Sequence, residues 1–272
     1  MAKLFDIQER IVPTWLAAVQ YLEPLAGRSA QNLVLEISNP LEITQEDRAS
    51  MYAVDVLLES CGQWPLNSVA GTIFPLDLYR RHGRPAFYAE FERMIKRGKA
   101  PGTWGTYALR MIARQGKSSR GIINPLEKIV EKISDAGQPD GASFQSCYEL
   151  GLTEPEEDHV ESAPDIGGEL PTYDPGLDGN RWRGLPCLSH VSFKRVANGT
   201  GHAVNLTAMY RSHSYCARAL GNLLGLAQLQ SFVAKEAGLA VGTLTCLSTH
   251  ATLDVEAWGG ITAARGILHP RT

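Results

Sequence analysis

One run of side chains in the C-terminal part of the sequence combines the functional groups of a catalytic site. In chain order the run supplies a thiol, a guanidinium, a hydroxyl, a carboxamide and an imidazole, from Cys187, Arg211, Ser212, Asn222 and His250. A cysteine attacks as the thiolate, and a neighbouring cation lowers the thiol pKa, so an arginine suits a nucleophilic cysteine. An arginine beside a serine can bind a phosphate through its guanidinium fork and the hydroxyl. A carboxamide can read the edge of a planar base, because it carries both a donor and an acceptor.

The sequence between these residues predicts a β-hairpin, then a helix and a strand. Residues 191–196 and 203–209 read as two strands, and the segment 197–201 between them contains Asn198-Gly199, a strong turn signal. A largely apolar helix is expected over 220–239 and a last strand over 242–247. Within such a helix Asn222 could equally be a buried amide that needs a polar partner in the core.

The first half of the sequence predicts further helices and strands. Helical periodicity covers 7–25, about 45–61, about 85–97 and 125–133, whereas 32–37 and 143–148 resemble strands. Thr44 precedes two carboxylates in the first turn of the second helix and is expected to cap it. Residues 150–184 are rich in acidic residues, proline and glycine. We therefore expect a single α+β domain over 1–272, with an acidic loop insertion at about 150–184.

Composition excludes several classes of protein. The 272 residues are 44% apolar and 20% charged, which is typical of a globular enzyme. The net charge of -3 provides no broad cationic surface for nucleic acid. No apolar stretch is long enough for a membrane span or a signal core, so a cytoplasmic protein is expected. The five cysteines are odd in number and form no Cys-x-x-Cys pair, which argues against disulfides and a metal site.

The run from Cys187 to His250 resembles the catalytic half of the thymidylate synthase family, which includes the pyrimidine-nucleotide hydroxymethylases. The family pattern is Pro-Cys, a hairpin, Tyr-Gln-Arg-Ser, an Asn eleven residues beyond the Arg, and a strand with His-x-Tyr. Pro186-Cys187, Arg211-Ser212, Asn222 and His250 match this pattern at the family spacing. The Gln is missing between Tyr210 and Arg211, and Thr252 stands where the family has tyrosine.

Two residues nearer the N-terminus extend the resemblance. Arg28, in Gly27-Arg28-Ser29, lies where the family has an arginine in a phosphate-binding loop. Asp55 precedes Gly62 by seven residues, and the family has its general acid/base glutamate at that spacing. An aspartate is one methylene shorter than a glutamate, which reduces its reach for proton transfer.

The sequence also departs from the family. The phosphate-binding arginines that the family takes from the partner subunit are replaced by Ala142 and Ser143, and the histidine after the cysteine is Leu188. Arg181 and Arg183 could restore the lost charge. The C-terminal tail over 259–272 also lacks the closing apolar terminus of the family.

The resemblance implies both a fold and a reaction. The fold would be a three-layer α/β-type structure, with a large, bent mixed sheet, helices on one face and a homodimer across the sheet. Cys187 would add to C6 of a pyrimidine nucleotide or nucleoside, so that C5 attacks the one-carbon unit of 5,10-methylenetetrahydrofolate. The product would be a methylated or a hydroxymethylated pyrimidine, with no metal involved.

The resemblance also assigns a role to each candidate residue. Arg211 would lower the pKa of Cys187 and hold the phosphate or sugar side with Arg28 and Ser212. Asn222 would pair with the uracil edge, since cytosine-specific relatives tend to have Asp at this position, and His250 would bind the ribose hydroxyl. Asp55 would move protons at O4 and C5. The residues leave uracil and cytosine, and monophosphate and nucleoside, open as substrates.

Two other functions remain open from the sequence. The departures from the family favour a non-catalytic or regulatory homologue that binds a nucleotide. A Cys-His hydrolase would use Cys187 with His190 or His250, although the sequence shows no nucleophile elbow. The remaining cysteines are expected in the core: Cys61, Cys147, Cys216 and Cys246.

Overall fold

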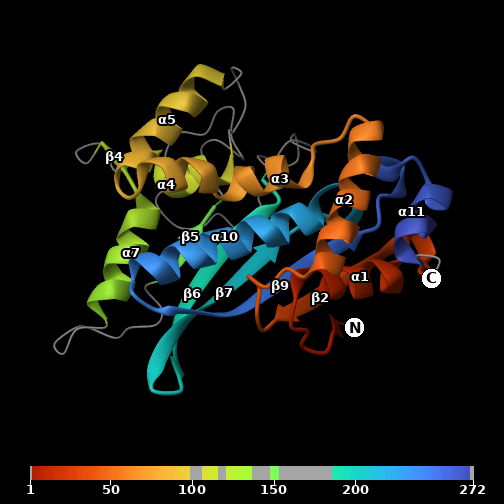
Figure 1. The fold of residues 1–272 in the computed structure, drawn as a ribbon, viewed down its shortest axis with the longest axis horizontal. Helices are drawn as coiled ribbons and strands as arrows, with labels where there is room; N and C mark the ends of the chain where they lie inside the picture. The colour runs from red at the N-terminus through yellow and green to blue at the C-terminus, as the bar shows by residue number, and fades with distance from the viewer. Residues whose placement is uncertain (1, 99–105, 116–120, 137–147, 153–185, 270–272) are drawn as a thin grey trace, which may run out of the picture.

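A mixed β-sheet forms the centre of the fold (Figure 1). The computed structural model of the chain describes residues 2–98, 106–115, 121–136, 148–152 and 186–269. In this part of the chain the main sheet has seven strands in the order β1-β2-β9-β7-β6-β5, with β8 beside β9. The strands are β1 Lys3–Leu4, β2 Ser29–Ile37, β5 Glu149–Gly151, β6 Leu188–Asn198, β7 Gly201–Tyr210, β8 His213–Ser214 and β9 Ala240–Thr252. A separate two-stranded sheet pairs β3 Arg114–Gln115 with β4 Ile122–Ile123.

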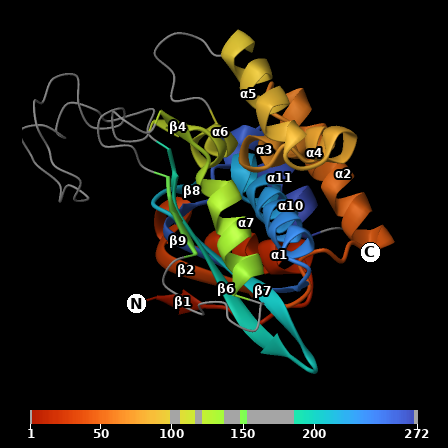
Figure 2. The same ribbon diagram turned by 90° about the vertical axis from the view of Figure 1, so that its left-hand side faces the viewer.

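The helices lie on one face of the main sheet (Figure 2). The helices before the hairpin are α1 Ile11–Leu22, η1 Ala26–Arg28, α2 Gln45–Ser60, α3 Leu66–Ile73, α4 Leu76–His82, α5 Ala86–Gly98, α6 Tyr107–Ile112 and α7 Pro125–Asp135. Those after it are the π-helical turn η3 Tyr215–Ala219, α10 Leu220–Glu236, η4 Val255–Trp258 and α11 Ile261–Leu268. This arrangement confirms the predicted α+β class.

The parallel pair β7 and β9 explains why the long helix α10 is buried. Leu206 lies opposite Leu244, and Ala208 lies opposite Cys246. Two parallel strands need a crossover connection, and here η3 and α10 supply it. α10 therefore packs across the sheet, and most of its side chains are buried.

Several predicted elements agree with the structure. The hairpin has the predicted turn, with strands that extend beyond the predicted ranges. The helices predicted over 85–97, 125–133 and 220–239 are α5, α7 and α10. Thr44 caps α2 as expected, because its hydroxyl accepts the backbone N–H of Asp47 while the Asp47 carboxylate accepts that of Thr44.

The predicted start of the first helix was wrong. The helix expected from residue 7 begins at Ile11, because Gln8 still forms a β-bridge with Ile37. At the start of the acidic insertion expected at about 150–184, Leu150 and Gly151 are part of β5. The rest of the proposed loop, 153–184, and most of the strand predicted over 143–148 lie outside the described residues. Within the described ranges, no helix has the length and apolarity that crossing a membrane requires.

Two glycines allow α10 to approach α3 closely. A Cβ on Gly221 would lie 2.7 Å from Val69 Cβ, and one on Gly225 would lie 2.8 Å from the Ala70 carbonyl oxygen. Both distances are shorter than van der Waals contact, so neither site admits a side chain without movement of α3. This contact fixes the position of the first turn of α10, which carries Asn222.

The glycine contact predicts a specific loss of stability. We expect Gly225→Ala to lower the free energy of unfolding by about 1–3 kcal/mol, because the new methyl group overlaps the α3 backbone. The control is Gly266→Ala in α11, where a Cβ meets nothing within 4 Å and helix propensity favours alanine by about 1 kcal/mol. Urea denaturation measures both changes. An unchanged midpoint for Gly225→Ala would refute the proposed close packing.

Candidate active site

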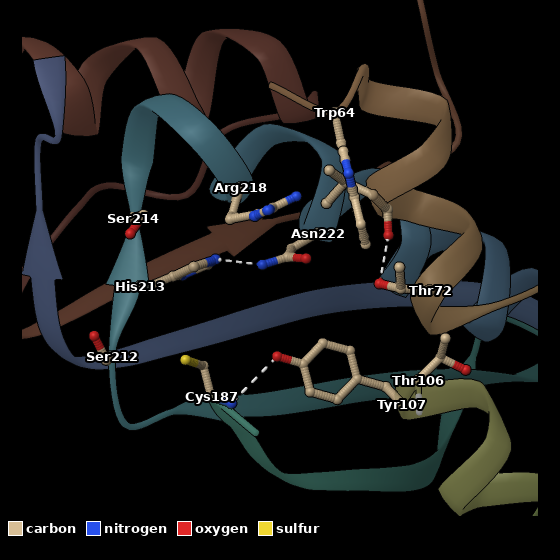
Figure 3. Close-up of a pocket in the computed structure, with 11 residues that line it drawn as sticks. Trp64, Thr72, Thr106, Tyr107, Cys187, Ser212, His213, Ser214, Arg218 and Asn222 are labelled. Atoms are coloured by element: carbon tan, nitrogen blue, oxygen red, sulfur yellow. Dashed lines mark hydrogen bonds between the residues drawn. The ribbon is translucent and has the colours of Figure 1, made fainter. Parts of the chain in front are cut away.

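A cavity of about 260 Å³ lies between α3, α6 and the segment that leads from β7 into α10 (Figure 3). Side chains from distant parts of the sequence point into it. The described residues that line it are Trp64, Val69, Thr72, Thr106, Tyr107, Cys187, Ser212, His213, Ser214, Arg218 and Asn222. Three of the residues predicted from the sequence, Cys187, Ser212 and Asn222, therefore share one cavity.

Cys187 is held by its backbone at the entry to β6. Its N–H donates to the Tyr107 hydroxyl at 3.2 Å, and its carbonyl accepts the backbone N–H of Arg211 at 2.9 Å. The first contact ties the cysteine to α6, and the second ties it to the end of β7. The thiol position is thus set by two independent elements.

The electrostatic environment of Cys187 contains opposing effects. Burial raises the pKa of the Cys187 thiol, while the charges of Arg211 and Arg218 lower it, and burial predominates. Arg211 acts in the predicted direction, but the net pKa is above that of an ordinary cysteine. The thiol is therefore protonated at neutral pH in the ligand-free protein.

Arg211 retains unused hydrogen-bonding capacity. Its Nη2 is buried and has no hydrogen-bond partner among the described residues. Buried guanidinium nitrogens are normally paired, so this atom is suited to an anionic or carbonyl group of a ligand. Ser212 follows directly and presents an exposed side chain at the cavity wall.

Asn222 is held by a polar network that the sequence did not indicate. Its side-chain nitrogen lies 3.0 Å from His213 Nε2, and His213 Nδ1 lies 2.9 Å from Ser248 Oγ. Burial lowers the pKa of His213 to about 3, so its ring is neutral at physiological pH. Asn222 is thus both a buried amide with a partner and a cavity-lining group.

Arg218 is a cation that lines the cavity and that sequence reasoning missed, whereas Arg211 does not line it. Its guanidinium carbon lies 4.9 Å from the centre of the Trp64 ring, within the range of a cation–π contact. Asp254 accepts the backbone N–H groups of Cys216 and Ala217 and so anchors the turn that carries Arg218. The i, i+4 spacing of Arg218 and Asn222 was the available signal, because such residues share a helix face.

Asp55 does not line the cavity. Its Oδ1 accepts the backbone N–H of Leu66 at 2.7 Å and so caps the start of α3. Trp64, two residues before Leu66, does line the cavity. Asp55 therefore supports one wall of the cavity from behind.

Arg28 and His250 do not line the cavity either: Arg28 is the last residue of η1, directly before β2, and His250 lies on the neighbouring strand β9. Arg28 has a left-handed φ of 48°, and its carbonyl accepts the N–H of Leu253. His250 is exposed on β9, with Nε2 3.1 Å from Thr252 Oγ1.

The histidines of the hydrolase hypothesis are not placed beside Cys187. His190 is on β6, with its Nε2 3.2 Å from Glu149 Oε2 on β5, and neither His190 nor His250 lines the cavity. Among the described residues no cluster of three His, Cys, Asp or Glu side chains could hold a metal ion. Arg181, Arg183, Ala142 and Ser143 lie outside the described residues.

Comparison with known proteins gives one partial similarity. No protein-family model matches the sequence. The chain is 35% identical over 92 residues to a protein of Methanococcoides burtonii described as "putative thymidylate synthase". The aligned stretch spans 34% of this chain and 38% of that protein. Part of the chain is therefore similar to a protein described as a thymidylate synthase.

The opposing effects on Cys187 predict its reactivity. We expect Arg211→Gln to slow alkylation of Cys187 by iodoacetamide at pH 8 by about three- to tenfold, because loss of the cation with the larger effect on Cys187 raises the thiol pKa further. Peptide mass spectrometry identifies the labelled cysteine, with Cys187→Ser as the reference. Arg265→Gln, which removes a surface arginine paired with Glu23, serves as the charge control. Equal or faster labelling of Arg211→Gln would contradict the assigned role.

Proposed function

We propose that the protein transfers a one-carbon unit to C5 of a pyrimidine nucleotide or nucleoside, through a bond between Cys187 Sγ and C6 of the ring. The observation that carries the proposal is the convergence of a thiol, an arginine, a hydroxyl and a carboxamide around one cavity, from Cys187, Arg218, Ser212 and Asn222. The charge of Arg211 also lowers the pKa of the Cys187 thiol, although Arg211 does not line the cavity. The partial similarity to a protein described as a thymidylate synthase supports the same assignment.

The residues of the cavity would divide the chemistry between them. The Cys187 thiolate forms the bond to C6, and the C5–C6 π electrons move toward C5 and O4, which makes C5 nucleophilic. Arg211 and Arg218 stabilise the thiolate, and the free Nη2 of Arg211 meets the phosphate or sugar side. C5 would then bond to the one-carbon unit, and the C5 proton would leave. Once the unit has separated from its donor and taken up hydride from the reduced folate, or water, the C6–S bond would break, which restores the C5–C6 double bond and the thiolate.

Asn222 would bind the base edge, while Asp55 would act at a distance. The Asn222 amide can pair with the ring N3 and an adjacent exocyclic group. Since Asp55 does not line the cavity, proton transfer between its carboxylate and a bound base would have to pass through water.

The family resemblance implies a reduced folate as the one-carbon donor, and the rim of the cavity fits such a ligand. Trp64 lines the cavity and is 55% exposed, so its indole can stack on a planar ring. Trp64 and Arg218 would hold the folate, which supplies the one-carbon unit when bound. At about 260 Å³ the enclosed space suits a base and sugar, which leaves the larger ligand at the open rim.

A non-catalytic nucleotide-binding protein is the second candidate. The raised pKa of Cys187 favours it, because a thiol that stays protonated is a poor nucleophile. The two candidates share a pyrimidine ligand and differ in covalent chemistry.

A tritium-release assay separates the candidates. With a 5-tritiated uracil nucleotide and methylenetetrahydrofolate, we expect the wild type to release tritium to water and Cys187→Ala to be slower by roughly a thousandfold or more. Cys61→Ala is the matched control, since Cys61 does not line the cavity. A thermal-shift panel of uracil and cytosine nucleotides and nucleosides, with and without folate, reports binding.

The outcomes of the two measurements are distinct. Ligand-induced stabilisation without tritium release would favour the non-catalytic protein. A ligand at about a hundredfold above its Kd adds roughly 2.7 kcal/mol, so binding is readily seen. Neither binding nor release across the panel would reject both candidates.

We further propose that the protein is a homodimer that associates through the open face of the sheet. Along each strand, every second side chain faces the helices, and the side chains between them point to the open face. On β2, β7 and β9 these outward side chains are half-buried or exposed: Val34, Thr207, Met209, Thr245 and Leu247. Met209, for example, is 36% exposed. A sheet face without helices needs another surface to cover it, and a second copy would do so.

Light scattering tests this arrangement. We expect the wild type to elute at twice the mass of one chain, and Met209→Arg to shift the population toward the monomer, because a charge would be buried in the interface. Tyr52→Arg, at a 72% exposed position on α2, is the control. A strictly monomeric wild type would reject the dimer.

A further inference from the structure

We propose that a groove in the helical layer is a second binding site, which takes a single fatty-acyl anion: an unbranched apolar chain with one carboxylate head. The groove has a volume of about 710 Å³ and is formed by α2, α3, α4, α5 and α10 with the segments beside them (Figure 1). None of the described residues that line it also lines the cavity of Cys187. The groove is therefore a separate site, whatever reaction the cavity supports.

The groove offers a large apolar surface. Most of the described residues that line it are apolar, and they include Ile43, Met51, Phe74, Phe91, Met94 and Leu224. Phe74, Phe91 and Leu224 are buried, whereas Met94 is 49% exposed. Methionine side chains are flexible and polarisable, so Met51 on α2 and Met94 on α5 can adapt to the shape of a bound chain. The volume of the groove lies within the range of about 300–1,000 Å³ that is usual for ligand pockets.

Three arginines give the groove a positive charge. Arg48 lies in the first turn of α2, and Arg80 and Arg81 lie in the last turn of α4. All three residues are exposed, and none forms an ion pair with any residue that the structure describes. Asp77 is the one carboxylate among the described residues of the groove. A guanidinium binds a carboxylate through two parallel hydrogen bonds, so these arginines fit an anionic head.

The end of a helix does not by itself explain where Arg80 and Arg81 lie. Cations favour the last turn of any helix, because they interact with its dipole. Helix α5 likewise ends in Lys96 and Arg97, but these two residues do not line the groove. The two pairs are therefore alike in their place on a helix and differ in their place relative to the groove.

Gly71 keeps the α3 wall of the groove open. It lies inside α3, where glycine is unfavourable for the helix. A Cβ at this position would meet nothing within 4 Å, unlike a Cβ at Gly221 or Gly225. Close packing of helices therefore does not account for Gly71, whereas a side chain there would project into the groove.

Helix α3 separates the groove from the cavity. Asn67, Gly71 and Phe74 follow one another at spacings of four and three residues, so they share one face of the helix, and they line the groove. Val69 and Thr72 lie on another face and line the cavity. A side chain added at Gly71 can therefore block the groove without entering the cavity.

Calorimetry with monomeric fatty acids tests the apolar part of the site. We expect the wild type to bind decanoate about tenfold more tightly than octanoate, because two more CH₂ groups leave water. Gly71→Leu should weaken decanoate binding by about tenfold or more, since the leucine fills the groove. Gly266→Leu in α11 is the matched control and should bind as the wild type does, because a Cβ there also meets nothing within 4 Å and Gly266 does not line the groove.

Octanol tests the head group, because it has the chain length of octanoate without the charge. We expect Arg80→Gln together with Arg81→Gln to weaken octanoate binding by about five- to tenfold and to leave octanol binding unchanged. The control is Lys96→Gln together with Arg97→Gln, which removes two consecutive cations outside the groove. A loss of folding would weaken the binding of both ligands, so the comparison separates charge from stability.

Several results would overturn the proposal. Decanoate binding that survives in Gly71→Leu would place the ligand elsewhere, and its loss in Arg218→Gln alone would place it in the Cys187 cavity. Octanol that binds the wild type as tightly as octanoate would remove the role of the arginines. Binding of phosphatidylglycerol vesicles without binding of monomeric decanoate would assign the surface to a membrane, and binding of neither would reject the site.

Discussion

The close packing of α10 between the sheet and α3 is the constraint on which the candidate site depends. The parallel pairing of β7 and β9 requires a crossover, and α10 is that crossover, so its position is set by the sheet. Gly221 and Gly225 let α3 press against it from the other side. Asn222 lies between these two glycines in the chain. The same contact that stabilises the core therefore places the carboxamide at the cavity.

The electrostatics of the site reflect a balance between burial and charge. Burial favours the neutral thiol of Cys187, and two arginines favour the thiolate without prevailing. An anion held by Arg211 would weaken its effect on the thiol, so Arg218 would then carry more of the stabilisation. A site with two cations can bind an anionic ligand and still keep one positive charge for the sulfur.

Sequence reasoning predicted the parts of the molecule that depend on local signals. The Asn198-Gly199 turn, the Thr44 cap and the apolar helix at α10 are all encoded by short patterns, and each is present. The start of α1 was misplaced because residues 3–8 run beside β2, and no local pattern reports such a tertiary contact. The same reason explains why the short helices α3 and α6, which form two walls of the cavity, were not predicted.

In the candidate site, too, local sequence patterns predicted some residues, while residues that depend on tertiary contacts were missed. The family pattern correctly grouped Cys187, Ser212 and Asn222, which line one cavity. The other residues that it proposed do not line that cavity: Arg28, Asp55, Arg211 and His250. The pattern could not find His213, because the neighbours of His213 are Asn222 and Ser248, which lie 9 and 35 residues away in the chain. Contacts across a sheet depend on strand register, and register follows from the whole fold.

Some polar groups of the site have hydrogen-bond partners within the protein, and one buried group does not. Beside Asn222, His213 is bonded through both ring nitrogens, and Ser248 and Tyr215 continue the network, so the desolvation of these buried groups is offset. Arg211, next to the cavity-lining Ser212 in the chain, keeps a buried nitrogen without a partner among the described residues. A buried donor left unpaired costs about 1–3 kcal/mol. A ligand that supplies the missing acceptor recovers part of that cost on binding. The hydrogen-bond network of His213 and Ser248 holds the Asn222 carboxamide in place, whereas the unpaired Arg211 guanidinium favours the binding of a ligand. Orientation and affinity therefore depend on different residues of the site.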